Sequence, residues 1–138
     1  MQLQYTIEER IPTARQWMAL RQSVGWPTFP LEAASRSLEL TPFCVCAFVG
    51  DELVGMGRVL GDQIITFYVG NVIVTPQYQG AGVGDQIMQR IMAYLRRSAV
   101  PGAIASLLAI KGIEDFYEQY GFERRPDENH GSGMSLRF

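Results

Sequence analysis

The stretch TPQYQGAGVG, Thr75–Gly84, decides the fold because it joins two segments of different periodicity. It follows the apolar run NVIV, which is typical of a buried strand, and precedes DQIMQRIMAYLRR, which has helical spacing. Three glycines at alternate positions, Gly80, Gly82 and Gly84, leave backbone amides uncovered where that helix begins. Because such amides attract anions, the stretch predicts a phosphate-binding loop between a strand and a helix.

Two common phosphate sites do not match this loop. A dinucleotide-binding fold needs a glycine at the sixth position and an acid about 20 residues later. Asp85 occupies that position here, and no Asp or Glu occurs between Gln86 and Ile113. A nucleoside triphosphate loop needs Lys and then Ser or Thr after its last glycine, and this chain has Asp85 and Gln86. A diphosphate with a long neutral arm, as in coenzyme A, remains the best match.

The flanking sequence predicts an α+β fold with a central mixed sheet. The helix that starts at Gly82 should be a crossover between two parallel strands, while the segment before it reads as an antiparallel meander with tight turns at 50–52 and 61–62. The predicted order is β-α-α-β-β-β-α-β-α-β, with the sheet splayed at strands 4 and 5. A bulge at Gly70 and Asn71 should start this splay. The expected strands are 3–9, three strands within 43–74, 101–110 and 133–138, and the expected helices are 12–25, 31–38, 82–97 and 112–120.

Composition limits the classes of function. The chain has 138 residues, of which 47% are hydrophobic, and this suits a single domain over residues 1–138. With a net charge of −2 and no long Lys/Arg block, nucleic acid is not an expected partner. No signal pattern or membrane-length apolar run is present, so we expect a cytoplasmic protein without a membrane partner. Cys44 and Cys46 should lie reduced on one face of a strand.

Two motifs carry a resemblance to a known family. VTPQYQGAGVG resembles the acyl-CoA loop of the GCN5-related N-acetyltransferases (GNAT family), with Gln79, Gly82 and Gly84 at the positions of its Q/R-x-x-G-x-G/A pattern. FYEQYGF, Phe116–Phe122, resembles the second signature of the same family. The tail RPDENHGSGM resembles a small-molecule branch of the family. The two motifs in order, taken with the predicted order of strands and helices, extend the resemblance over essentially the whole chain.

The resemblance implies an N-acetyltransferase that uses acetyl-CoA as cosubstrate and needs no metal. The loop amides would face the pyrophosphate, the end of the preceding strand would bond the pantetheine arm, and one of its amides would polarise the thioester carbonyl. Tyr117 occupies the position of the family's general acid, and its phenol keeps its proton at neutral pH. The implied cofactor-binding residues are Ile73, Val74, Gln79, Gly80, Ala81, Gly82, Val83, Gly84, Asp85 and Phe116.

The base and the acceptor are the least specified parts of the site. The resemblance places an acid in many relatives where this chain has Asn71, and an Asn side chain cannot accept a proton. Two alternatives for the general base are a water ordered by Asn71 and the lone His130. A frequent family Asn is Ile110 here. Aromatic residues predict a pocket for a hydrophobic primary amine under the segment WPTFP, and the resemblance also admits a homodimer. These residues are Trp26, Phe29, Phe67 and Tyr68.

The departures at Asn71 and Ile110 motivate an alternative function. In that reading the chain is a non-catalytic acyl-CoA-binding or sensor module on the same fold. A third reading, an interaction domain built on this fold, predicts no coenzyme A binding at all.

Overall fold

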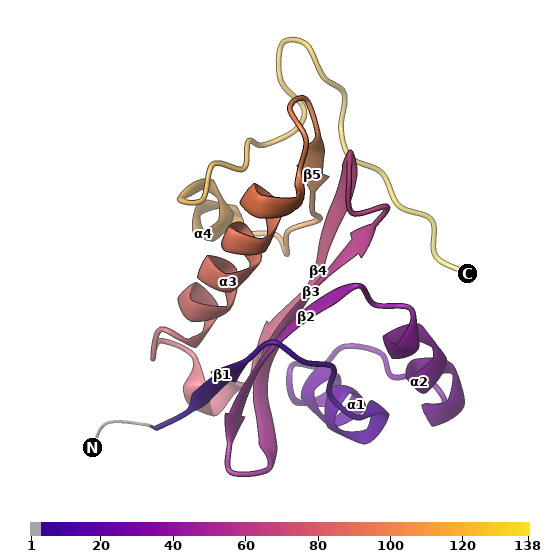
Figure 1. Cartoon of the computed structure of the whole chain (residues 1–138), viewed down its shortest axis with the longest axis vertical. Helices are drawn as coiled ribbons and strands as arrows, with labels where there is room; N and C mark the ends of the chain where they lie inside the picture. Colours follow the sequence, from indigo (N-terminus) through magenta and orange to yellow (C-terminus); the bar gives the residue numbers. More distant parts are fainter. Residues whose placement is uncertain (1–3) are drawn as a thin grey trace. The chain divides into compact units, whose positions relative to one another are not determined.

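The computed structural model describes residues 4–138, and this part of the chain divides into two compact units. The first unit ends at Ala105 and the second comprises Ser106–Phe138. Five strands form one mixed sheet in the order β1-β2-β3-β4-β5 (Figure 1). The elements are β1 Thr6–Glu8, α1 Ala14–Ser23, α2 Leu31–Glu39, β2 Phe43–Val49, β3 Glu52–Gly61, β4 Thr66–Val74, a 3-10 turn Pro76–Tyr78, α3 Val83–Ser98, β5 Ile104–Ser106 and α4 Glu114–Glu118.

The two helices predicted near the N-terminus are both present. Thr13 caps α1 through a reciprocal pair of bonds, in which its hydroxyl accepts from the Gln16 amide at 3.1 Å and its own amide donates to Gln16 Oε1 at 2.9 Å. The second helix, α2, begins directly after Pro30, as the sequence predicted. Their buried side chains, Trp17, Met18, Leu20, Ala34 and Leu38, pack in one cluster with residues of β2, β3 and β4.

The sheet has two differently covered faces. A Cβ placed on Gly55 would lie 2.9 Å from Val83, and one on Gly57 would lie 2.8 Å from Ile91, so these two glycines of β3 let α3 approach the strand closely. Met56, which points to the opposite face by strand alternation, packs in the cluster of α1 and α2. In Figure 1, α3 therefore covers one face of the sheet and α1 with α2 the other.

The antiparallel meander from β2 to β4 confirms the central prediction, but its second turn differs from the one expected. A short turn at Gly50 and Asp51 joins β2 to β3. Between β3 and β4, however, the chain makes a longer loop over Asp62–Ile65, in which one carboxylate oxygen of Asp62 accepts three successive amides at 2.8, 2.9 and 3.0 Å. The prediction of a tight turn there was wrong because an Asp that satisfies several loop amides stabilises a wider connection.

Two predicted strands also differ. The strand expected over 101–110 is limited to β5, Ile104–Ser106, whose first amide donates to the Ile65 carbonyl at 3.0 Å beside the start of β4. β5 therefore lies beside the beginning of β4, and the C-terminal half of β4 has no β5 neighbour. This arrangement agrees with the predicted splay. The strand expected over 133–138 is absent from the part of the chain described, because alternating apolar residues form a strand only where a partner edge is available.

The cysteines match their prediction. Cys44 and Cys46 are both buried and free, with their sulfur atoms 3.9 Å apart on the same side of β2. The hydrogen bond to Cys44 and burial raise the pKa of the Cys46 thiol far above its usual range. Both thiols are therefore packing groups of the core.

Candidate functional site

The predicted phosphate loop has the backbone geometry that its glycines suggest. Gly80 and Gly82 both have a φ of +83°, in the left-handed region, and Gly82 occupies the N-cap position of α3. A Cβ on Gly80 would meet nothing within 4 Å. The side chain of Gln79 turns back and donates to the Val74 carbonyl at 2.8 Å, which ties the start of the loop to the end of β4.

The start of α3 provides donors for an anion. The first helical bond runs from the Gln86 amide to the Gly82 carbonyl at 3.1 Å, so the amides of Val83 and Gly84 precede it and have no acceptor within the helix. The helix is 16 residues long, and its dipole adds partial positive charge at this end. Asp85 turns its carboxylate toward the helix surface, where Gln89 donates to it at 2.7 Å. These features fit a diphosphate held by backbone amides.

A β-bulge interrupts β4 where the sequence predicted one. Met56 pairs with Ile73, but Arg58 pairs with Gly70, so β4 contains one residue more than β3 in this stretch. Asn71 lies in the bulge with a φ of +53°, a conformation that Asn tolerates better than most residues. The side-chain oxygen of Asn71 accepts a hydrogen bond from Nε of Arg58 at 2.7 Å. The predicted water-ordering residue is thus fixed by an arginine.

Backbone alternation distinguishes the two residues predicted to contact the pantetheine arm. The Thr75 amide donates to the Val54 carbonyl at 2.9 Å, so backbone groups of Thr75 point toward β3. In an antiparallel ladder these directions alternate, which turns the amide of Val74 to the opposite edge and that of Ile73 toward β3. Ile73 is also 3% exposed and belongs to the core cluster. Val74 is therefore the better placed of the two for an added ligand.

Arg58 is the residue that sequence reasoning missed. Its side chain is buried, and its Nη1 donates to the hydroxyls of Ser37 at 3.2 Å and Thr41 at 3.0 Å, both near the end of α2. The guanidinium lies 4.5 Å from the ring centre of Trp17. Burial lowers the pKa of Arg58. No sequence motif indicates this cluster, because its members come from four separate elements, α1, α2, β3 and β4.

The aromatic residues predicted to bind the acceptor have different environments. Trp26 is half-buried against the core cluster, Phe29 is 53% exposed, and the guanidinium of Arg21 lies 5.4 and 5.2 Å from the centres of their rings. Tyr68 on β4 is also partly exposed. Phe67, in contrast, is buried at 2% exposure and is a core residue, so its predicted place in a pocket wall was wrong.

The second unit carries the other predicted signature. Phe116 and Tyr117 lie in α4, where their rings meet edge to face at 5.0 Å, and Tyr117 also meets Phe122 at 6.3 Å. Phe116 and Tyr117 are half-buried. His130 lies in the exposed C-terminal loop, where its Nδ1 is 2.8 Å from a carboxylate oxygen of Asp127, and this contact lowers the pKa of Asp127.

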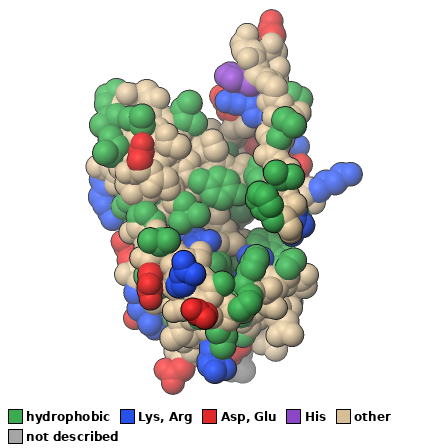
Figure 2. Space-filling model, turned by 90° about the vertical axis from the view of Figure 1, so that its right-hand side faces the viewer, with side chains coloured by type: hydrophobic (Ala, Val, Ile, Leu, Met, Phe, Trp, Pro, Cys, Tyr) green, Lys and Arg blue, Asp and Glu red, His purple; other side chains and the backbone are tan. Residues whose placement is uncertain are grey.

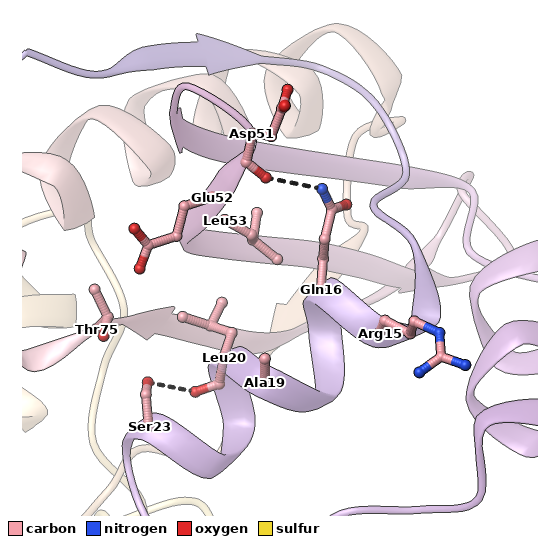
Figure 3. Close-up of a pocket in the computed structure, with 9 residues that line it drawn as sticks. All are labelled: Arg15, Gln16, Ala19, Leu20, Ser23, Asp51, Glu52, Leu53 and Thr75. Carbon is pink, nitrogen blue, oxygen red and sulfur yellow. Dashed lines mark hydrogen bonds between the residues drawn. The ribbon is translucent and has the colours of Figure 1, made fainter.

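A surface pocket of about 320 Å³ lies elsewhere, between α1 and the turn that joins β2 to β3 (Figure 3). Gln16 donates across it to the Asp51 carbonyl at 3.2 Å, and Ser23 donates to the Leu20 carbonyl at 2.6 Å. None of the predicted site residues lines it. The left-handed glycines and the buried charge belong instead to the loop and to the Arg58 cluster.

Comparison with known proteins identifies the family. A profile described as the acetyltransferase (GNAT) domain matches residues 25–136. The chain belongs to the GNAT family. A solved structure from meticillin-resistant Staphylococcus aureus, a protein of unknown function described as a probable acetyltransferase, matches with a TM-score of 0.89 at 32% identity over 98% of this chain and 100% of that one.

Other proteins similar to this chain include named acetyltransferases. An N-acetyltransferase of Prochlorococcus marinus, named uncharacterized and ycf52-like, is 29% identical over 80% of this chain and 62% of its own length. The histone acetyltransferase TAP1 of Glycine max is 30% identical over 79% of this chain and 51% of its own length. The chain thus spans about three fifths or less of the curated relatives it matches most strongly. Arabidopsis glucosamine-6-phosphate N-acetyltransferase shares the fold, with a TM-score of 0.74 at 14% identity over 99% of both chains.

Two further observations concern the described residues. Between residues 4 and 138 no helix combines the length and the apolar character needed to cross a bilayer. In the same part of the chain, no three His, Cys, Asp or Glu side chains are grouped so that they could hold a metal ion.

Proposed function

We propose that this GNAT chain is an acetyl-CoA-dependent N-acetyltransferase that acetylates a primary amine of a small molecule by direct attack. The observation that carries the proposal is the connection from β4 to α3. It places left-handed glycines at Gly80 and Gly82 between a bulged strand and the uncovered amides of a long helix. This combination suits a ligand that has both a diphosphate and an amide-containing arm.

Each part of the loop would have its own role in binding acetyl-CoA. The amides of Gly80 to Asp85 would donate to the pyrophosphate, and Gln79 would keep the loop attached to β4. Val74 would pair with the pantetheine arm as a neighbouring strand does. Phe116 would contribute apolar contact, and acetyl-CoA would supply an activated acetyl group.

The chemical step requires a polarised carbonyl, a deprotonated amine and an acid for the leaving thiolate. The amide of Val74 is the donor we assign to the carbonyl oxygen, where negative charge develops. Tyr117 would donate its hydroxyl proton to the thiolate sulfur of coenzyme A. A water held near Asn71 would accept the amine proton, because the Asn side chain itself cannot.

The acceptor would lie against the aromatic residues Trp26, Phe29 and Tyr68. Phe29 is 53% exposed, and all three residues belong to the first unit. Trp26 and Phe29 lie in the segment between α1 and α2, and Tyr68 lies in β4. We propose a small amine with an apolar body, which such rings would cover. The cytoplasm and a homodimer remain predictions, and two relatives are named chloroplastic.

The experiment measures release of free coenzyme A thiol from acetyl-CoA across a panel of primary amines, together with calorimetric titration of coenzyme A. Turnover with at least one amine is the expected result. Tight coenzyme A binding without turnover on any amine would favour the alternative, a non-catalytic acyl-CoA sensor. That alternative has support in the neutral Asn71, whose side chain cannot accept the proton of the amine. Absence of coenzyme A binding would contradict both.

A further inference from the structure

The cluster around Arg58 contains a buried positive charge that its protein neighbours do not neutralise. The groups bonded to its guanidinium are one amide oxygen, of Asn71, and two hydroxyls, of Ser37 and Thr41. In residues 4–138 no carboxylate lies within ion-pair distance of Arg58. The ionisable groups that influence its pKa are Cys44, Arg21 and Tyr68, and none of them is a carboxylate.

One end of the guanidinium also remains available. Nε and Nη1 of Arg58 have protein acceptors, whereas Nη2 has none among the described residues. Among the described residues, Nε1 of Trp17 is the one fully enclosed side-chain nitrogen or oxygen atom without a hydrogen-bond partner. Since Nη2 of Arg58 also has no partner but is not such an atom, it is not fully enclosed. Trp17 lies directly under the guanidinium, at 4.5 Å. Two donors without acceptors thus belong to the same cluster.

A buried guanidinium of this kind is costly unless an anion completes its hydrogen bonds. Arg21 brings a second positive charge to the same region, at 6.0 Å from the Trp17 ring. Figure 2 shows the face on which α1 and α2 lie, where Lys and Arg side chains (blue) lie beside both hydrophobic (green) and acidic (red) ones. The two guanidinium groups and the Trp17 ring combine positive charge with an aromatic surface, which suits a ligand with an anionic group and an apolar body.

We propose that Arg58 binds a carboxylate of the acceptor, so that the substrate is an α-amino acid with an aromatic or other apolar side chain. This inference rests on the proposed N-acetyltransferase function and specifies its acceptor. The position of the guanidinium argues for a carboxylate close to the amine, because Nε of Arg58 lies 2.7 Å from Asn71 in the bulge that we assign to the reaction centre. In an α-amino acid a single carbon atom separates the two groups.

Asn71 leaves the positive charge of Arg58 uncompensated. An Asp in its place would form an ion pair with Arg58 and leave no net charge for a ligand. The neutral amide holds the guanidinium at 2.7 Å without neutralising it. The residue that weakens the case for a side-chain base therefore strengthens the case for an anionic acceptor.

The test compares three ligands that share one ring: L-phenylalanine, L-phenylalaninamide and phenethylamine. Calorimetric titration into the protein saturated with coenzyme A measures binding without requiring turnover. Because a charge-assisted pair with Arg is among the stronger hydrogen bonds, phenylalanine should bind about 10- to 100-fold more tightly than either neutral analogue. Affinities within about twofold of one another, or no binding of any of the three, would overturn the proposal.

Two variants locate the preference at Arg58. Arg58→Gln should abolish it, while Arg90→Gln, which removes a charge from the surface of α3 where Arg90 pairs with Glu9 at 2.9 Å, should leave it unchanged. Since Arg58 is buried and its replacement could unfold the chain, Asn71→Asp provides a second route. Its added carboxylate should compete for Arg58 and weaken phenylalanine binding about tenfold without weakening phenethylamine binding.

The two proposals fail in different ways. Turnover of amines without any preference for the carboxylate would leave the N-acetyltransferase function standing and remove only the amino-acid acceptor. A carboxylate preference in a folded Asn71→Asp protein equal to that of the wild type would also contradict the role of Arg58. Absence of acetyl-CoA binding would remove the underlying function, whatever the ligands do.

Discussion

The two faces of the sheet pack against helices through opposite kinds of β3 residues, glycines on one face and a buried arginine on the other. On the α3 face, Gly55 and Gly57 have no side chains, so the helix lies against the strand and its first amides remain uncovered. On the face of α1 and α2, Arg58 extends a long charged side chain into the core and is bonded there by neutral groups. In the proposed function the first face would bind a ligand through its backbone, and the second would bind one through a side chain.

This difference explains what each face can recognise. Backbone amides at a helix N-terminus bind any ligand with a suitably placed diphosphate, so they suit a cosubstrate that many enzymes share. A buried guanidinium selects for the charge and shape of its partner, which suits a substrate that must be distinguished from similar amines. Neither face of the described sheet supplies the acid that the proposed reaction needs.

The largest expected effect therefore concerns Tyr117, which belongs to the second unit. Tyr117→Phe removes one hydroxyl and keeps the ring that meets Phe116 at 5.0 Å, so folding and coenzyme A affinity should change little. Loss of a general acid typically lowers the rate about 10²- to 10⁴-fold, so kcat should fall by that order while the acetyl-CoA KM stays constant. The lower end of this range is expected because a thiolate is a good leaving group. Steady-state kinetics beside a thermal melt would measure this, and near-native kcat in a natively melting variant would leave Tyr117 as a packing residue.

A second prediction tests the backbone face. Gly82→Asp introduces a side chain at a φ of +83° and a negative charge where the pyrophosphate should bind. Left-handed strain should lower the stability of the fold by about 1–2 kcal/mol. The repulsion between the new carboxylate and the pyrophosphate should weaken coenzyme A binding at least tenfold.

Gly102→Asp is its matched control. Gly102 also has a positive φ, of +91°, and open space around its Cβ position, but it lies in the turn before β5. Both variants should lose similar stability, and Gly82→Asp alone should lose affinity. Equal coenzyme A affinities in calorimetry would exclude the loop from the cofactor site.

The sequence predicted the backbone face far better than the other one. Gly80 and Gly82 are needed at positive φ, and a requirement of the backbone appears as a fixed residue type at a fixed spacing. The bulge at Gly70 and Asn71 was predicted for the same reason. Arg58, in contrast, forms its contacts with residues 17 to 41 positions away in the chain, apart from Asn71, and no local pattern indicates such a cluster.

The predicted elements that failed lacked a tertiary partner. Alternating residues over 133–138 satisfy the pattern of a strand, but Met134, Leu136 and Phe138 are all highly exposed and no strand pairs with them in the described chain. The prediction that Phe67 lines a pocket was wrong because Phe67 is buried in the core. Phe67 and Tyr68 are adjacent in the sequence, but strand alternation turns them to opposite faces. Periodicity identifies a face of an element but does not say what covers that face.

A third prediction sharpens the contrast at β3. Gly57→Ala places a Cβ 2.8 Å from Ile91 and 2.9 Å from Ile87, so α3 or its side chains must shift. We expect a loss of about 1–3 kcal/mol in the free energy of unfolding, at the lower end because the contacted atoms are side-chain ends. Gly131→Ala is the control, since nothing lies within 4 Å of its Cβ position. Denaturant unfolding that gave both variants the same stability would contradict the close approach of α3.

The smallest effect is expected at Asp62, in the loop that joins β3 to β4. Three amide hydrogen bonds, from Thr66, Ile64 and Ile65, lower the pKa of its carboxyl below the ordinary 3.8. Because the folded state holds this proton less tightly than the unfolded state, the carboxylate stabilises the fold above about pH 4, and that stabilisation is lost as the pH falls through the lowered folded pKa.

Asp62→Ala should therefore lower the Tm at pH 7 slightly, and the difference from the wild type should shrink in acid. Asp62→Asn retains an acceptor oxygen without the charge, so it should lie between the two proteins at pH 7. Coenzyme A affinity should be unchanged in both variants, because the hydrogen bonds to the Asp62 carboxylate come from amides of Ile64, Ile65 and Thr66. Thermal melts across the acidic range measure this, and a Tm difference that grew as the pH fell would show that the carboxylate destabilises the fold and that the assigned sign is wrong.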